Sequence, residues 1–331
     1  MHRSRFSGRG LNIGLNEAQV VETVIEINDL SRSFGKKVAL DGVSLEILPT
    51  RVYGLVGGNG HGKTTLIKHV LGLLRAQSGT VRVFGKDPVR DPAGVLERCG
   101  YVSEHRDLPE WMRVDELLRY VAAFHPTWDS SYAAELVEML ELDGSAKVKH
   151  LSKGMRAQTA LIAAAAHRPE LLVLDEPSTG LDAVVRKDIL AVTVRSAAEN
   201  GATVLFSSHL LNEVELMSDE IIMLEHGRVA LAESADSLRE NHFVVTTQTQ
   251  MGAHEIVRFS EDSTSEILSC RKQAGTLSLV IKGDPARLVD RLRAHGENEV
   301  VARPASLEES FVARAGRDRV SAKSLELADV Q

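Results

Sequence analysis

Apolar runs and helically spaced apolar residues alternate through the middle of the chain. Continuous apolar runs predict buried strands at 51–56, 171–174 and 203–207. Apolar residues at helical spacing follow the first strand over 65–74 and separate the other two over 183–199. Buried strands that alternate with helices predict a parallel α/β sheet.

Alternating apolar and polar residues predict more exposed strands. Two edge-type strands are expected before the first buried one, at 24–27 and 43–47, with a turn at Asp41-Gly42. Single strands are also expected at 80–84 and 99–103.

Two helices and a hairpin complete this first part of the chain. Apolar spacing predicts helices at 114–124 and 131–142, which together indicate a helical insertion at about 105–165 between sheet segments. The runs 221–224 and 228–232 flank the turn signal His226-Gly227 and predict a hairpin. These patterns predict one principal domain over residues 23–240.

The pattern changes at about Asn241. Strands are expected at 242–247, 255–259 and 277–281, and helices at 285–295 and 306–315. Ser306 with Glu309 three residues later is a capping box, which marks a helix start. We therefore expect a small C-terminal α+β appendage over 241–316. Residues 1–22 are expected to be a disordered leader and 317–331 a charged tail.

Composition narrows the class of protein. The 331 residues carry 39 Lys and Arg against 46 Asp and Glu, a net charge of −7, which argues against a dedicated nucleic-acid binder. The longest nearly uncharged apolar run, at 159–166, is too short to cross a bilayer, so a soluble, cytoplasmic chain is expected. Cys99 and Cys270 lie far apart and are interpreted as buried thiols.

A glycine-rich loop follows the first buried strand and matches the phosphate-binding pattern GxxxxGK[ST] at every fixed position. Backbone N–H groups of such a loop can surround phosphate oxygens, and the N-terminus of the following helix favours the same anion. The lysine would reach the β- and γ-phosphates of ATP, and the threonine hydroxyl would hold Mg²⁺. The predicted nucleotide-binding residues are Gly57, Gly58, Asn59, Gly60, His61, Gly62, Lys63, Thr64 and Thr65. For His61 we expect the backbone, rather than the ring, to contribute.

Two carboxylates follow the second buried strand. Asp175 and Glu176 come directly after 171–174, where a buried strand delivers side chains to the carboxyl edge of a parallel sheet. Asp175 would support Mg²⁺ through its water shell, and Glu176 would act as the base for the attacking water. Together with the glycine-rich loop, this pair predicts ATP hydrolysis.

The order of these motifs resembles the nucleotide-binding subunit of ATP-binding cassette (ABC) transporters, and the resemblance runs from about Val24 to Ala232. Residues 151–156, LSKGMR, stand where that family has its LSGGQ signature at a helix start. Residues 178–182, STGLD, resemble the D-loop of the family. The resemblance implies a P-loop NTPase cassette with a parallel core sheet, an antiparallel β subdomain and a helical subdomain.

The resemblance also implies roles for further residues. Phe34 would lie against adenine, and His209 would be the switch histidine that bridges Glu176 and the γ-phosphate. Ser152 and Gly154 in the signature, with Asp182 in the D-loop, would face ATP that is bound to a second copy. A complete site would therefore need two chains, and a homodimer is expected.

Two departures from the family pattern alter the expected site. Glu104 stands where the family has a glutamine; its carboxylate can approach Mg²⁺ but adds negative charge beside three phosphates. Lys153 and Met155 replace glycine and glutamine in the signature. We therefore assign Thr64, Glu104 and Asp175 to the metal and expect hydrolysis or coupling to be tuned by Glu104.

The stretch from Glu104 to Met155, which contains these departures, resembles the cassettes of bacterial exporters whose permease is a separate membrane chain. This implies a peripheral position on the inner face of the cell membrane, with a helix of the permease received between Glu104 and about Tyr120. Trp111 and Met112 would be anchors there, or Trp111 would pack within its own helical insertion. Two alternatives stay open at this point: a soluble ABC ATPase that acts on ribosomes or DNA, and a nucleotide-dependent regulatory module without turnover.

Overall fold

The computed structural model describes residues 23–251, 265–297 and 299–314. Its centre is a mixed sheet with strand order β5-β6-β7-β3-β8-β9, in which only β9 is antiparallel to its neighbour. The strands of this sheet are β3 (Val52–Val56), β5 (Cys99–Val102), β6 (Leu171–Asp175), β7 (Thr203–Ser208), β8 (Glu220–Glu225) and β9 (Arg228–Ser234). The predicted parallel α/β sheet and the predicted hairpin are confirmed.

Helices follow the strands of this sheet along the chain and cover it. Helix α1 (Lys63–Val70) follows β3, α6 (Ala183–Asn200) joins β6 to β7, and α7 (Leu211–Met217) follows β7. Helix α1 ends four residues before the predicted helix end at Leu74, because the chain turns at Gly72, which adopts a φ of 69°. Strands β3 and β6 are buried at every position, which explains their continuous apolar sequences.

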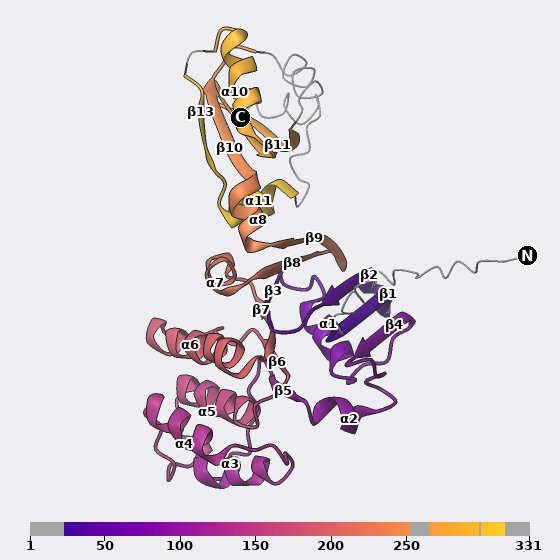
Figure 1. Ribbon diagram of the computed structural model, residues 1–331, viewed down its shortest axis with the longest axis vertical. Helices are drawn as coiled ribbons and strands as arrows, with labels where there is room; N and C mark the ends of the chain where they lie inside the picture. Colours follow the sequence, from indigo (N-terminus) through magenta and orange to yellow (C-terminus); the bar gives the residue numbers. More distant parts are fainter. Residues whose placement is uncertain (1–22, 252–264, 298, 315–331) are drawn as a thin grey trace, which may run out of the picture.

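A second, antiparallel sheet has the order β2-β1-β4 and lies to one side of the core sheet (Figure 1). It consists of β1 (Ile25–Phe34), β2 (Lys37–Ile47) and β4 (Ser78–Val83). The predicted turn at Asp41-Gly42 is wrong, since both residues lie inside β2. The pairing of β1 with β2 shifts register around Leu30 and Arg32, and Gly42 takes a φ of 65° there. The turn signal therefore marks a β-bulge.

The predicted helical insertion lies between β5 and β6. It contains α3 (Val114–Ala122), α4 (Ser130–Met139) and α5 (Lys153–Ala165), which pack together at the end of the molecule away from the C-terminal sheet (Figure 1). Asp129, expected to mark the break between helices, caps α4 by accepting a hydrogen bond from the Tyr132 N–H. A short helix, α2 (Pro92–Leu96), precedes β5 and was not predicted.

The C-terminal part begins with α8 (Ala235–Asn241) and forms an antiparallel sheet with the order β11-β12-β10-β13. Its elements are β10 (His242–Gln248), β11 (Glu266–Gln273), β12 (Thr276–Lys282), α10 (Pro285–Ala294), β13 (Val301–Pro304) and α11 (Leu307–Arg314). The capping box is confirmed: the Ser306 N–H donates to Glu309, whose own N–H donates to the Ser306 hydroxyl. The predicted strand at 255–259 lies outside the described residues, as do the expected leader and tail.

Contacts tie the C-terminal part to the cassette. Oε1 of Glu233 on β9 lies 2.6 Å from Lys282 Nζ and 3.1 Å from Arg314 Nη2. Leu307 and Phe311 of α11 pack on the larger apolar core. The domain boundary at about residue 240 stays a prediction. Along the described stretches, no helix combines the length and the apolar character that a membrane crossing requires.

Candidate functional site

The glycine-rich loop turns tightly between β3 and α1. Gly62 adopts a φ of 106° immediately before Lys63, the first residue of α1, and a Cβ there would lie 2.4 Å from the Ala39 carbonyl oxygen. Only glycine fits that position, because the left-handed conformation and the close backbone both exclude a side chain. Helix α1 therefore begins at the loop with its N-terminal amides directed toward any anion held there.

The ammonium group of Lys63 lies at the centre of the site. Its Nζ donates to the Gly57 carbonyl oxygen at 2.7 Å and lies 3.1 Å from Glu176 Oε1. Both side chains are more than nine-tenths buried. A buried lysine that is paired with a carboxylate beside glycine N–H groups gives the loop a fixed positive charge, as phosphate binding requires.

Asp175 ends β6 and is held by the neighbouring strand. The parallel register sets it opposite Ser207, whose hydroxyl donates to Asp175 Oδ1 at 2.7 Å and accepts from the Glu176 N–H at 2.9 Å. The Thr64 hydroxyl approaches the same carboxylate oxygen at 3.3 Å. Burial raises the pKa of Asp175, and the hydrogen bonds from Ser207 and Thr64 offset only part of that rise. A cation between Thr64 and Asp175 would favour the ionised carboxylate.

Glu176 has a different electrostatic environment from Asp175. Its Oε2 lies 2.7 Å from His209 Nδ1 and accepts a hydrogen bond from the Thr179 hydroxyl at 2.9 Å. Burial raises the pKa of Glu176, but the contacts with His209, Lys63 and Thr179 outweigh burial and leave the pKa below its ordinary value. Glu176 is therefore an ionised, hydrogen-bonded carboxylate at neutral pH. Its φ of 50° is unusual for a residue other than glycine and is often found at functional sites.

Lys63, Thr64, Glu176 and His209 share one pocket of about 390 Å³, lined by Phe34, Lys37, Ala39, Gly58, Asn59, Gly60, Gly62, Lys63, Thr64, Thr65, Glu104, Glu176, Thr179 and His209. Neither Gly57 nor Asp175 is among the lining residues. Most of the residues predicted from the loop and from the family resemblance therefore lie together. Phe34 is half exposed at the pocket rim, with the Arg32 guanidinium 4.8 Å from its ring centroid. The His61 ring lies 4.9 Å from the His226 ring, and His61 is not among the residues that line the pocket. The expectation that its backbone contributes to nucleotide binding stays a prediction.

The three residues predicted from the signature and the D-loop also lie outside this pocket. Ser152 is the exposed N-cap of α5 and accepts a hydrogen bond from the Met155 N–H at 3.1 Å. Asp182 caps α6 by accepting from the N–H groups of Val184 and Val185. Gly154 packs directly against Val185, where a Cβ would lie 2.8 Å from its side chain. The starts of α5 and α6 thus form one surface that does not face the phosphate loop of the same chain.

The sequence analysis missed three residues at the site. Lys37 lines the pocket, and its ammonium group lies close to Gly60 of the glycine-rich loop: a Cβ added at Gly60 would be 3.1 Å from Lys37 Nζ. Thr179 holds Glu176 but was seen only as part of the D-loop motif. Glu213 is buried and accepts hydrogen bonds from the hydroxyls of Ser178 and Ser208 at 2.7 and 3.1 Å, which fixes the segments that precede Leu181 and His209. Nothing in the local sequence around Glu213 indicates these partners.

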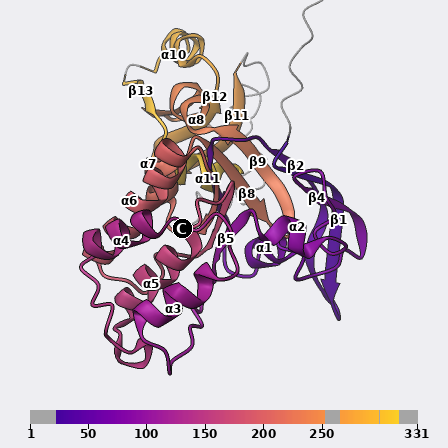
Figure 2. The same cartoon turned by 60° about the horizontal axis from the view of Figure 1, so that its bottom comes forward.

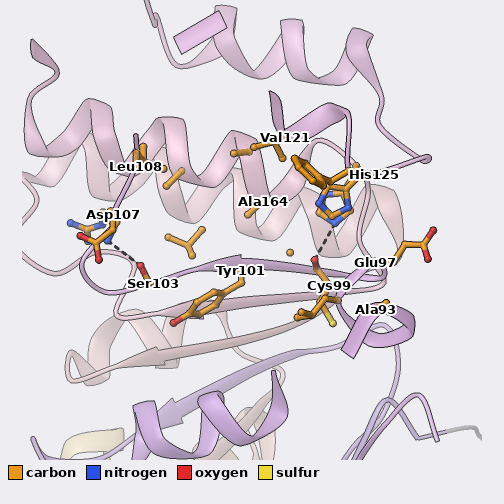
Figure 3. Close-up of a pocket in the computed structure, with 18 of the residues that line it drawn as sticks. Ala93, Glu97, Cys99, Tyr101, Ser103, Asp107, Leu108, Val121, His125 and Ala164 are labelled. Atoms are coloured by element: carbon orange, nitrogen blue, oxygen red, sulfur yellow. Dashed lines mark hydrogen bonds between the residues drawn. The ribbon is translucent and has the colours of Figure 1, made fainter. Parts of the chain in front are cut away.

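A larger groove of about 820 Å³ lies between β5 and the helical insertion (Figure 3). Tyr101 and Cys99 of β5 form one wall, and Val121, His125 and Ala164 face them from the helical insertion (Figure 3). The His125 and His167 rings stack with centroids 3.8 Å apart at one end, and the pKa of His167 falls to about 4 because the ring is buried. Of its lining residues only Arg106, Asp107 and Leu108 fall in the segment 104–120 that was expected to receive a permease.

Trp111 is not part of this groove. Its side chain is 74% exposed, so the expectation that it packs within its own helical insertion is wrong. Met112 packs on the edge of the larger core, and neither residue lines the groove. The aromatic side chain at the groove rim is Phe124, which lies just after α3 and is 63% exposed. The expectation that Trp111 and Met112 anchor a permease helix stays a prediction.

Comparison with known proteins supports the nucleotide-binding interpretation. The ABC transporter family model matches residues 40–179. The chain is 31% identical to the daunorubicin resistance ATP-binding protein DrrA3 of Streptomyces coeruleorubidus, over 91% of this chain and 98% of that protein. It is 30% identical to the Nod factor export ATP-binding protein I of Burkholderia lata, over 89% of this chain and 97% of that protein.

A solved ATP-binding subunit of an ABC transporter has the same fold, with a TM-score of 0.61 and 28% identity, over 66% of this chain and 92% of that one. The two curated relatives, in contrast, match this chain almost along their whole length. The pocket described above and these similarities lead to one identification. The chain belongs to the ABC transporter family, as an ATP-binding subunit and an ATPase.

Proposed function

We propose that ATP is hydrolysed in the pocket between the phosphate loop and the ends of β6 and β7, with Glu176 as the base. The observation that carries this assignment is the position of Glu176 between two partners: its Oε1 lies 3.1 Å from Lys63 Nζ and its Oε2 lies 2.7 Å from His209 Nδ1. The ionised Glu176 accepts a proton from the attacking water, and Lys63 neutralises charge on the γ-phosphate. His209 orients Glu176 toward that water.

Mg²⁺ fits the oxygen donors at one end of this pocket. The Thr64 hydroxyl and the Asp175 carboxylate are 3.3 Å apart, and Glu104 lines the same pocket. Mg²⁺ keeps most of its water and takes few protein ligands, so a hydroxyl and one or two carboxylates suffice. Bound there, it would neutralise charge on the β- and γ-phosphates. Glu104 would add a carboxylate near the ion and would tune hydrolysis or coupling.

Replacing Thr64 by valine is expected to raise the Mg²⁺ concentration that ATPase activity requires. The substitution removes one oxygen donor while it keeps the shape of the side chain, so the Mg²⁺ concentration for half-maximal ATPase activity should rise by about tenfold. Titration of activity with Mg²⁺ at fixed ATP measures the change. Thr64→Ser, which restores the hydroxyl, should behave like the unmodified chain; equal titration curves for all three proteins would exclude Thr64 as a ligand.

His209→Ala is expected to shift the acidic limb of the pH profile of kcat. In the unmodified chain the pKa of Glu176 is below its ordinary value, so kcat should stay constant as pH falls and decline only as pH passes through that low pKa. Loss of the His209 contact removes a group that lowers the pKa, so the decline should begin at higher pH. Normalised profiles test this, and Thr179→Val, which removes a second lowering contact, should shift the limb in the same direction. A limb that stays in place in both variants contradicts the proposed environment of Glu176.

The site is proposed to be completed by a second copy of the chain. Members of the family work as dimers and with membrane permeases. Ser152 and the backbone at Gly154 start α5 on a surface away from their own phosphate loop, and a helix N-terminus suits the γ-phosphate of ATP that is bound to a facing chain. A symmetric pair would then contain two equivalent sites.

We further propose that the partner is an export permease that holds the chain at the inner face of the cell membrane. The names of the two relatives that match along almost their whole length refer to drug resistance and to export. The groove beside β5 has the size and apolar lining that suit a short helix, and Phe124 at its rim offers an aromatic contact. A role on ribosomes or DNA has no comparable support.

Photo-crosslinking from the groove tests this partner. Phe124 is replaced by benzoylphenylalanine, which keeps the aromatic ring, and the full chain is irradiated in its native membranes. We expect a crosslink to a chain with several membrane spans. The matched control carries the same group at Leu216 on α7, which is 78% exposed and lies outside the groove, and should give no such product. A ribosomal protein or DNA captured from Phe124, with no membrane protein, would overturn the transport assignment.

A further inference from the structure

Arg106 is a buried arginine in the loop that follows β5. Its backbone N–H donates to the carbonyl and the hydroxyl oxygens of Ser103, both at 3.1 Å, which closes a tight turn. The residue is only 9% exposed and has a φ of 52°, a backbone conformation that residues other than glycine rarely adopt. A charged residue held in such a place needs compensating contacts, because burial of a cation is costly.

The compensating contacts all come from the loop that carries Glu176. The Nη2 group of Arg106 donates to the carbonyl oxygens of Glu176, Pro177 and Thr179 at 3.3, 2.8 and 3.1 Å. No carboxylate pairs with this guanidinium among the ion pairs of the described residues. Hydrogen bonds from a charged donor are stronger than those between neutral groups, so this arginine is a strong clamp on the loop.

These contacts fix the side of the loop that faces away from the phosphate pocket. On the pocket side, Glu176 is held through its N–H by Ser207 and through its carboxylate by Lys63 and His209. Arg106 instead holds the carbonyl groups of the same residues, so it sets the backbone from which the carboxylate extends. The φ of 50° at Glu176 requires such support, because that conformation is strained for a glutamate.

The loop around Arg106 also faces both pockets of the molecule. Glu104 lines the nucleotide pocket, whereas Arg106 and Asp107 line the groove beside β5. In Figure 3 the dashed contact to Ser103 lies at the end of the groove near Asp107 and Leu108. A segment that enters the groove would therefore meet the side chain that holds the Glu176 backbone.

We propose that Arg106 is a positioning residue for the hydrolytic step: from the groove side it holds the backbone of 176–179 so that the Glu176 carboxylate points at the attacking water. This inference rests on the proposed role of Glu176 as the base. Arg106 touches neither ATP nor the attacking water, and it acts only through the loop.

Kinetics of Arg106→Gln in the full-length chain test the proposal. Glutamine is too short to reach the three carbonyl groups, so the backbone at Glu176 should relax, and kcat should fall by about ten- to a hundredfold, as a small misplacement of a catalytic group costs. The KM and Kd for ATP should change less than about twofold, because the phosphate loop is not involved.

Arg106→Lys and Arg195→Gln are the matched variants. Lysine keeps the charge and can still donate to the loop, so its kcat should lie between those of the unmodified chain and Arg106→Gln; it also keeps the test valid where the glutamine variant does not fold. Arg195 pairs with Glu135 and Glu199 far from the pocket, and its loss should change no kinetic constant. An unchanged kcat in both Arg106 variants, or a parallel loss of kcat and ATP affinity, would overturn the proposal. Glu176→Gln, measured beside them, separates the two levels: an active Glu176→Gln contradicts the proposed function itself.

Discussion

Replacing Glu176 by glutamine is expected to reduce kcat for ATP hydrolysis by about 10²–10⁴-fold while the chain still binds ATP. Glutamine keeps the size of the side chain and can still contact His209 and Thr179, but it cannot accept the proton of the attacking water. The loss should fall on kcat alone, because the phosphate contacts come from the loop at 57–65 and from Lys63.

Phosphate release and nucleotide binding are the two measurements that this prediction needs. The rate of phosphate release should fall, and the Kd for ATP should stay within about threefold of the unmodified value. Glu170→Gln is a suitable control, since Glu170 precedes the same strand but pairs with Arg98 at the surface. Phosphate release from Glu176→Gln within threefold of the unmodified rate would mean that another group acts as the base.

Lys63→Ala is expected to produce the largest loss of ATP affinity. The ammonium group is 6% exposed and lies between the loop and Glu176, so its removal takes away a charged donor to phosphate and leaves a buried carboxylate without its nearest cation. A hydrogen bond to a charged group is worth about 1.5–3 kcal/mol, which corresponds to a rise in the Kd for ATP of about ten- to 150-fold.

Lys68→Ala is the matched control for this variant. Lys68 lies on the same helix, but its side chain is exposed and does not line the pocket. Equilibrium titration with a fluorescent ATP analogue should show a weaker Kd for Lys63→Ala only. The same Kd in both variants would show that the loop binds phosphate through its backbone alone.

Much of the site could be predicted because its chemistry is local in sequence. The glycine spacing, Lys63 and Thr64 define the loop, and an apolar strand that ends in Asp175-Glu176 defines the opposite edge. Parallel pairing of β6 with β7 then brings His209 to Glu176, as the resemblance implies. Local motifs at the carboxyl ends of adjacent strands converge by topology alone.

The remaining site contacts are long-range and leave no local signal. Arg106 donates hydrogen bonds to carbonyl groups that lie 70 to 73 residues away in the sequence. Glu213 meets Ser178 in the same way, across 35 residues. A sequence indicates that a charged residue is buried only where it also shows a suitable side-chain partner. Every residue has a backbone carbonyl group, so the sequence cannot show which carbonyl groups pair with Arg106.

The fold shows a similar limit at strands with weak patterns. Strand β13 (Val301–Pro304) is exposed at all four positions, so no apolar alternation marks it. Strand β11 (Glu266–Gln273) contains a register shift that interrupts the alternation of inward and outward residues. At Asp41-Gly42 the same kind of irregularity produced a turn signal inside a continuous strand.

A complementation assay tests most directly whether ATP is hydrolysed in a pocket that two chains share. One variant is Glu176→Gln, which keeps its α5 start intact. The other is Ser152→Asp, which keeps a good N-cap for α5 but sets a negative charge opposite the γ-phosphate of a facing chain. Each variant alone should be nearly inactive.

Mixing the two variants in equal amounts should restore activity. In a mixed pair, the intact pocket of the Ser152→Asp chain faces the intact Ser152 of the Glu176→Gln chain. Random pairing makes half of the dimers mixed, and each mixed dimer has one working site of two. The mixture should therefore recover about a quarter of the unmodified ATPase rate. A mixture that stays as inactive as its components, although both variants fold and bind ATP, would contradict a site completed by a second copy of the chain.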